Sequence, residues 1–101
     1  MQSQFGAKIR SLRERQYLFL RQVVPLLEMD TAKLSKIEKG LRQLKRVQIP
    51  IIAEILKANS DELGTLWLAD QIYAVVKDKK LANEAMQEVE KNCNQKRKRN
   101  K

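Results

Sequence analysis

The sequence predicts an all-α fold of five or six helices, and three observations lead to this prediction. Gly and Pro are scarce, at three and two residues, which disfavours a turn-rich β-sandwich. The 101 residues are 43% hydrophobic and 33% charged, enough to bury one modest core. Apolar residues also recur at helical spacing from the first segment onward, so helices are the better prediction.

The first two segments predict helices that pack through one apolar stripe. In residues 4–15, Phe5, Ile9 and Leu12 follow an i, i+4, i+7 pattern, and basic residues surround them. The apolar run at 18–29 predicts a second helix that points Leu20, Val23, Val24 and Leu27 inward. Pro25 lies within it, and a proline inside a helix costs about 3 kcal/mol. We therefore expect this helix to be short, kinked or both.

A third helix is predicted between Asp30, a good N-cap, and Gly40, a residue suited to a helix end. Leu34 and Ile37 form one narrow apolar stripe, while small, polar and cationic residues cover the rest of the surface. Such a helix can be anchored through one side and offer a broad cationic face to a polyanion.

Two further helices follow a basic loop at 41–46. Pro50 fits the first turn of the fourth helix, which we expect to bury Val47, Ile51, Ile52, Ile55 and Leu56. Asn59 or Ser60 precedes the fifth helix, at about 61–77. This helix is apolar over more than one stripe, so we expect it to pack against the core and also against a partner chain or a sixth helix.

A sixth helix is predicted at about 80–91. Its narrow apolar stripe consists of Leu81, Ala82, Ala85, Met86 and Val89. The basic segment 92–101 is expected to be disordered unless bound.

The net charge of +9 is unevenly distributed. The segments 1–29, 30–46 and 91–101 contribute +3, +4 and +6, while 47–90 contributes −4. Because a local basic excess attracts polyanions, nucleic acid is expected at the third helix and the tail.

Other classes of protein fit poorly. Cys93 is the only cysteine and there is no histidine, which excludes an intramolecular disulfide and leaves a zinc site without ligands. We find no Gly-rich phosphate loop, paired catalytic carboxylates or serine with a base, so no enzyme, catalytic residue, metal or cofactor is predicted. No signal-peptide or membrane-spanning run is present, which favours the cytoplasm, in association with the nucleoid.

Two motifs resemble a known family. Leu12-Arg13-Glu14 precedes the second helix, and the run from Asp30 to Gly40 has the form D-x-x-x-L-S-K-I-E-K-G. Over residues 9–63 the chain resembles the Xre/Cro family of phage-repressor-type helix-turn-helix regulators. The resemblance implies a DNA-binding domain at 1–63, with a C-terminal helical extension at 64–91 for dimerisation and a basic tail at 92–101.

The family places base contacts on the outer face of the third helix. Here that implies base contacts from Thr31, Ala32, Lys33, Ser35 and Lys36. Lys can donate to guanine, and Ala or a Thr methyl can meet the thymine methyl. Basic neighbours suit phosphate contacts that set the register on the duplex, namely Arg13, Arg21, Lys39, Arg42, Lys45 and Arg46.

The chain departs from the family pattern at several positions. Phe19 and Leu20 replace a small polar cap and a phosphate-binding Gln, Glu28 replaces a turn glycine, and Leu44 replaces a frequent proline. The family also implies that Glu38 pairs with a basic residue of the first helix, either Arg10 or Arg13.

The predicted function is sequence-specific binding of duplex DNA by a homodimeric transcription regulator, acting on a palindromic operator. The expected dimer contacts are Leu66, Trp67, Ile72, Tyr73 and Val76. One alternative is a controller protein of restriction-modification genes. Another is an antitoxin or protein-interaction module that binds a partner protein and also regulates its own gene. A single-strand or RNA binder is less favoured, because the sequence offers no exposed aromatic platform.

Overall fold

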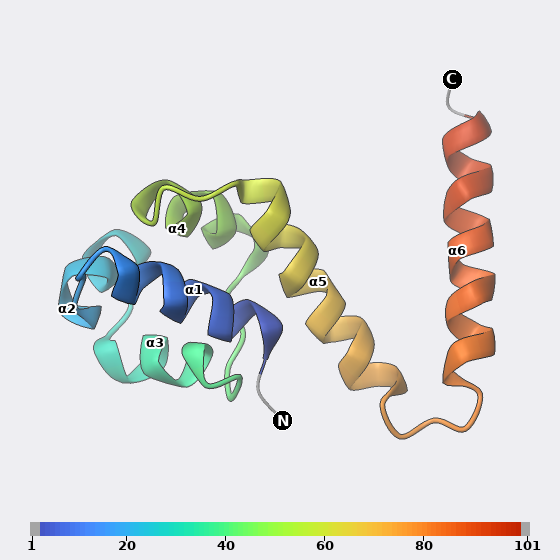
Figure 1. Cartoon of the computed structure of the whole chain (residues 1–101), viewed down its shortest axis with the longest axis horizontal. Coiled ribbons are helices and arrows are strands. Elements are labelled where there is room, and N and C mark those ends of the chain that lie inside the picture. Colours follow the sequence, from blue (N-terminus) through green and yellow to red (C-terminus); the bar gives the residue numbers. More distant parts are fainter. Residues whose placement is uncertain (1–2, 100–101) are drawn as a thin grey trace. The chain divides into compact units, whose positions relative to one another are not determined.

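The computed structural model describes residues 3–99, and the side chains as far as Asn94. These residues contain helices and no strands, which confirms the predicted all-α class (Figure 1). The elements are α1 Gln4–Arg15, α2 Leu20–Val23, the 3-10 helix η1 Val24–Leu27, α3 Thr31–Glu38, the 3-10 helix η2 Arg46–Gln48, α4 Ile49–Ile55, α5 Ser60–Val76 and α6 Ala82–Arg99. The chain divides into two compact units, the first ending at Gln71 and the second beginning at Ile72.

A single hydrophobic core holds the first unit together. The predicted stripes of the first and third helices supply Phe5 and Ile9, and Leu34 and Ile37, all of them buried. The other core residues are Val23, Val24, Leu27, Leu44, Ile49, Ile52, Ala53, Leu56 and Leu63. Every α-helix from α1 to α5 therefore contributes apolar area, and this burial is the main favourable contribution to the stability of the unit.

The second α-helix is short, as predicted, and is followed by a 3-10 helix that contains Pro25. α2 ends at Val23, and the chain continues as the 3-10 helix η1, with Pro25 at its N-terminal end. A proline is tolerated there because the first amides of a helix have no partner within it. Gln22 accepts a hydrogen bond from the Phe19 amide at 2.7 Å, which satisfies one of the amides at the start of α2.

The turn before α3 requires one residue in an uncommon backbone conformation. Glu28 adopts left-handed backbone angles, with φ 53° and ψ 44°, a conformation that glycine reaches most easily. Asp30 then caps α3 by accepting a hydrogen bond from the Lys33 amide at 2.8 Å, as the sequence predicts. Gly40 ends the helix with a φ of 81°.

The prediction for the buried face of the fourth helix was partly wrong. Val47 is 75% exposed and Ile51 is also exposed, whereas Ile49 and Ala53 are buried. The reason is that residues 46–48 form a separate 3-10 turn, so α4 begins only at Ile49, with Pro50 in its first turn. The stripe of α4 therefore starts at residue 49 and continues through 52, 53 and 56.

α5 begins at Ser60 and is capped by Asn59, which accepts a hydrogen bond from the Glu62 amide at 3.0 Å. The first compact unit ends at Gln71. Contacts within this unit explain why it includes the first part of α5. Leu66 and Trp67 pack against the core, and Asp70 accepts hydrogen bonds from the amides of Gln4 and Phe5 and from the Ser3 hydroxyl.

In the second unit, α6 runs to Arg99 and is longer than the predicted helix, which ends at Lys91. This helix includes residues 92–99, for which the sequence predicts disorder in the absence of a partner, while residues 100–101 lie outside the described part. Gln, Lys and Arg are good helix formers, so the polar segment can continue a helix begun by 82–91. None of the helices within residues 3–99 combines the length and hydropathy needed to span a bilayer.

Candidate DNA-binding surface

The core holds α3 from one side. Leu34 and Ile37 are each 1% exposed and fix the helix to the rest of the first unit. α1 approaches the end of α3 closely at Gly6, where an added Cβ would lie 2.5 Å from the Ile37 carbonyl oxygen. Only glycine allows this backbone approach, so Gly6 contributes to the position of α3.

The opposite face of α3 is open. Ala32, Lys36 and Lys39 are exposed and lie three or four residues apart, so they share the side of the helix that faces away from Leu34 and Ile37. Thr31 and Lys33 are exposed and Ser35 is half-buried, on the flanks or at the N-terminus. The structure thus presents all five predicted base-contact residues on one helix, with Ser35 the least accessible.

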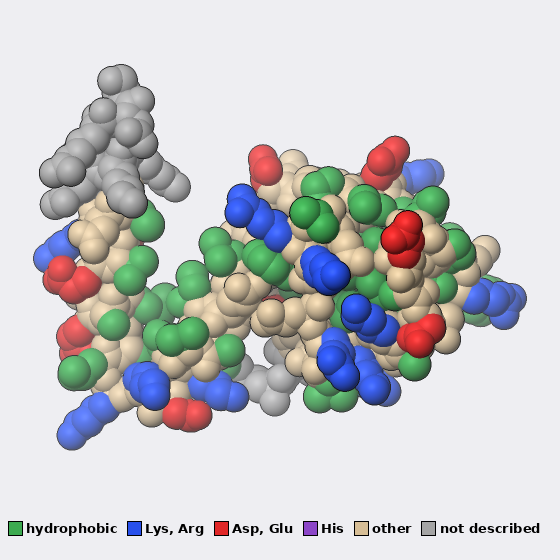
Figure 2. All heavy atoms as spheres, turned by 180° about the vertical axis from the view of Figure 1, so that it is seen from behind, with side chains coloured by type: hydrophobic (Ala, Val, Ile, Leu, Met, Phe, Trp, Pro, Cys, Tyr) green, Lys and Arg blue, Asp and Glu red, His purple; other side chains and the backbone are tan. Residues whose placement is uncertain are grey.

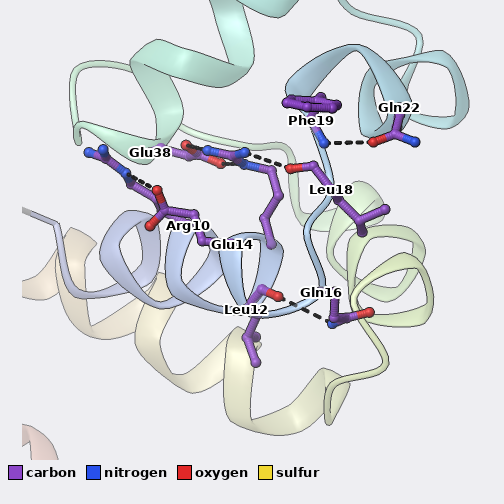
Figure 3. A network of polar contacts seen from close by, with 9 residues as sticks. Arg10, Leu12, Glu14, Gln16, Leu18, Phe19, Gln22 and Glu38 are labelled. Carbon is purple, nitrogen blue, oxygen red and sulfur yellow. Dashed lines mark hydrogen bonds and ion pairs between the residues drawn. The ribbon is translucent and has the colours of Figure 1, made fainter.

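Arg13 does not belong to this surface, contrary to the expected phosphate contact. Its Nε and Nη2 donate hydrogen bonds to Glu38 at 2.7 and 3.0 Å, and its Nη1 donates to the Leu18 carbonyl at 2.8 Å (Figure 3). The side chains of Arg13 and Glu38 are only 14% and 6% exposed. The guanidinium is therefore committed to the interior, where it connects α1, α3 and the segment just before α2.

The sequence analysis left Arg10 and Arg13 as possible partners of Glu38, and the structure shows that Arg13 is the partner. Arg10 instead contacts Glu14 on the surface of α1 at 3.6 Å. The hydrogen bond to Glu38 raises the pKa of Arg13, and partial burial opposes this effect. Arg13 thus remains a cation at neutral pH, and its charge is neutralised within the fold.

The other predicted phosphate contacts are exposed. Lys39 lies at the end of α3, while Arg42, Lys45 and Arg46 follow in the basic loop and the start of η2. Arg21, on α2, lies over the Phe19 ring with its Cζ 4.7 Å from the ring centroid. This stacking favours one orientation of the guanidinium.

Hydrogen bonds from Trp67 and Gln48 hold the basic loop against the rest of the first unit. Trp67 Nε1 donates to the Leu44 carbonyl at 2.7 Å, and the Leu44 side chain is buried. Gln48 accepts from the Lys45 amide at 2.9 Å and donates to the Leu27 carbonyl at 3.1 Å. These contacts hold the loop that follows α3 without using any of its cationic side chains.

Figure 2 shows Lys and Arg side chains close together along the lower edge of the first unit, on the face that it displays. Four of the exposed cations, Lys39, Arg42, Lys45 and Arg46, fall within eight residues of sequence. A basic surface beside an exposed helix is the electrostatic signature of nucleic-acid binding.

Sequence reasoning missed three residues that position this surface. Gln48 fixes the basic loop, Asp70 caps α1, and Gln16 donates to the Leu56 carbonyl at 2.6 Å. For Gln48, the glutamine three residues after Lys45 is a signal of an amide cap. The contacts of Asp70 with α1 and of Gln16 with Leu56 join residues 40 or more positions apart, so no local pattern indicates them.

The five predicted dimer contacts fall in both units. In the first unit, Leu66 and Trp67 are partly buried against the core. In the second unit, Ile72 and Tyr73 are 40% and 45% exposed and Val76 is half-buried. Leu66 and Trp67 thus already pack against the core of their own chain.

A family model for the helix-turn-helix domain matches residues 4–66. These residues include α1 to α4 and the first turns of α5, and hence all of the candidate surface. No curated protein and no solved structure matches the chain. The match covers more than half of the sequence and coincides with the short α2, the turn at 28–30 and the exposed α3. The chain therefore belongs to the helix-turn-helix domain family, whose fold is a DNA-binding one.

Proposed function

We propose that the protein is a sequence-specific transcription regulator that inserts α3 into the major groove of duplex DNA. The observation that carries the proposal is the division of α3 into a buried apolar side and an exposed side with Ala32, Lys36 and Lys39. A helix is about 10–12 Å across with its side chains, and the major groove is about 12 Å wide. α3 can therefore enter the groove while its apolar side stays in the core.

Base recognition is assigned to the side chains nearest the groove floor. Lys36 can donate to guanine O6 and N7, Lys33 can reach a base edge or the backbone, and Ala32 or the Thr31 methyl can contact a thymine methyl. Ser35 can contact a base only from the edge of the exposed face of α3, because its side chain is half-buried. Lys36 is thus the residue from which we expect most of the discrimination between bases.

Arg21, Lys39, Arg42, Lys45 and Arg46 would contact phosphates on either side of the groove. Arg13 is excluded from this set because its donors are used by Glu38 and Leu18. In a homodimer, two copies of α3 would lie about 34 Å apart in successive major grooves, which requires a roughly palindromic operator.

The test compares how two alanine substitutions, one of a lysine and one of an arginine, change binding to DNA. The operator is first obtained by selecting bound duplexes from a random pool. Lys36→Ala should then relax the preference at one base pair in each half-site, with a loss of about 1–3 kcal/mol for the best sequence. Arg46→Ala is the matched control and should weaken binding to all sequences alike, because a phosphate contact carries no base information. If Lys36→Ala also weakens all sequences alike, Lys36 is not a base-reading residue.

A further inference from the structure

Phe19 is a large apolar side chain that lies outside the core. It is 58% exposed, whereas its neighbours Leu18 and Leu20 both pack against the core. Phe19 is the N-cap residue of α2, but a phenyl ring cannot accept a capping hydrogen bond from the first amides of a helix. The ring therefore serves neither burial nor capping.

The peptide bond between Leu18 and Phe19 is held at both of its polar atoms (Figure 3). The Leu18 carbonyl accepts a hydrogen bond from Arg13 Nη1 at 2.8 Å, and the Phe19 amide donates to Gln22 Oε1 at 2.7 Å. Arg13 is itself bound to Glu38, the last residue of α3. The backbone that carries the Phe19 ring is thus fixed relative to the end of α3.

The ring in turn orients Arg21. The Arg21 Cζ lies 4.7 Å from the centroid of the Phe19 ring, within the roughly 6 Å of a cation–π contact. Arg13 has a different kind of partner, because the carboxylate of Glu38 neutralises its charge. A phenyl ring is neutral, so it favours one position of the Arg21 guanidinium and leaves the positive charge available to an anion.

Arg21 lies on the helix that precedes α3 in the helix-turn-helix, and α2 packs against α3. A guanidinium can donate two parallel hydrogen bonds to one phosphate, provided that its planar fork is correctly oriented. An unrestrained arginine has many rotamers, and restricting them on binding costs affinity. A stack that restricts Arg21 before DNA arrives lowers this cost.

We propose that Phe19 is a positioning residue, which holds the guanidinium of Arg21 in place for a DNA phosphate beside α2. The inference rests on the proposed insertion of α3 into duplex DNA and adds a residue that no charge pattern indicates. Loss of the ring keeps the charge of Arg21 but lowers the population of the binding-competent rotamer. Because a phosphate carries no base information, this loss weakens binding to all sequences alike.

A double-mutant cycle tests the coupling on the duplex that the wild type selects from a random pool. Phe19→Leu should weaken binding roughly two- to fivefold, which corresponds to the about 0.5–1 kcal/mol of an exposed cation–π contact. In the Arg21→Gln background the same substitution should leave the affinity unchanged. Phe19→Trp keeps a ring beside the guanidinium and should bind like the wild type.

Arg46→Gln is the matched control background, because Arg46 is a proposed phosphate contact on a different element, η2. In this background Phe19→Leu should still weaken binding roughly two- to fivefold. An equal loss in the Arg21→Gln background would mean that the ring contacts DNA itself. That result, or a Phe19→Leu variant that binds like the wild type, overturns the proposal.

NMR of the free protein tests the stack without DNA. The ring current of Phe19 should shift the Arg21 side-chain protons upfield, and Phe19→Leu should abolish this shift. A wild type without the shift overturns the proposal.

The wild type also separates this inference from the proposed function. A wild type that shows the shift but selects no duplex would overturn the DNA-binding role, and with it the role of Arg21 at a phosphate. A wild type that selects a duplex but binds it no more tightly than Phe19→Leu does would overturn the positioning role alone and leave the role of α3 intact.

Discussion

At the scale of the residue, the buried pair of Arg13 and Glu38 helps to fix the orientation of α3. It joins α1 to the last residue of α3, and its third hydrogen bond reaches the chain just before α2. One guanidinium thus connects two helices, α1 and α3, and the segment that precedes α2.

Glu38→Ala should lower the free energy of unfolding by about 3–5 kcal/mol, since it leaves the largely buried Arg13 without its counter-charge. Glu14→Ala is the matched control. It removes an exposed i, i+4 pair with Arg10, worth about 0.3–0.5 kcal/mol. Urea denaturation of both variants measures the difference. Similar decreases in stability would show that burial does not distinguish the two ion pairs.

At the scale of the element, two glycines in helices have opposite roles. Gly6 lies on α1 where the carbonyl oxygens of Ile37 and Glu38 would be 2.5 and 2.6 Å from a Cβ. Gly64 lies on α5, and a Cβ there would meet nothing within 4 Å. The first is required by packing between helices, and the second only weakens its own helix.

Gly6→Ala should therefore destabilise the protein by about 1–3 kcal/mol, as overpacking does, because α1 and α3 must move apart. Gly64→Ala should stabilise it by about 1 kcal/mol, the difference in helix propensity between the two residues. Thermal denaturation followed by circular dichroism would detect both shifts. Stabilisation by both substitutions would mean that α1 does not approach α3 as closely as described.

At the scale of the whole molecule, the distribution of charge determines how binding responds to salt. The segment 30–46 and the C-terminal segment are basic, while the segment between them has a net charge of −4. The side chains of 95–101 lie outside the described structure, but the sequence places five Lys and Arg residues among them. We expect these residues to add attraction for phosphates without base preference.

Deleting Asn94 to Lys101 should weaken DNA binding mainly at low salt. It should also flatten the plot of log K against log salt concentration by about 0.9 for each phosphate that the shortened chain no longer neutralises. Replacing Lys77, Lys79 and Lys80 by Gln is the control. It removes three positive charges from the segment 47–90, where no DNA contact is expected, and should change this slope little. If the deletion leaves the slope unchanged, the tail does not contact DNA phosphates.

The sequence by itself determined the all-α class, the cap at Asp30, the interruption at Pro25 and the free face of α3. Each of these depends on residues within a few positions of one another, so amide capping, side-chain spacing and proline sterics suffice to predict them. The motif from Asp30 to Gly40 also sufficed to predict the family, which the match to residues 4–66 bears out.

Only the tertiary structure decided which arginine pairs with Glu38, that the remaining donor of Arg13 reaches the Leu18 carbonyl, and how Trp67, Gln48 and Asp70 hold the basic loop and α1. It also showed that Val47 is exposed, because a 3-10 turn delays the start of α4. The physical reason is common to most of these cases. Such contacts join residues 21 to 67 positions apart, and their partners are chosen by the packing of whole helices, which no local pattern contains.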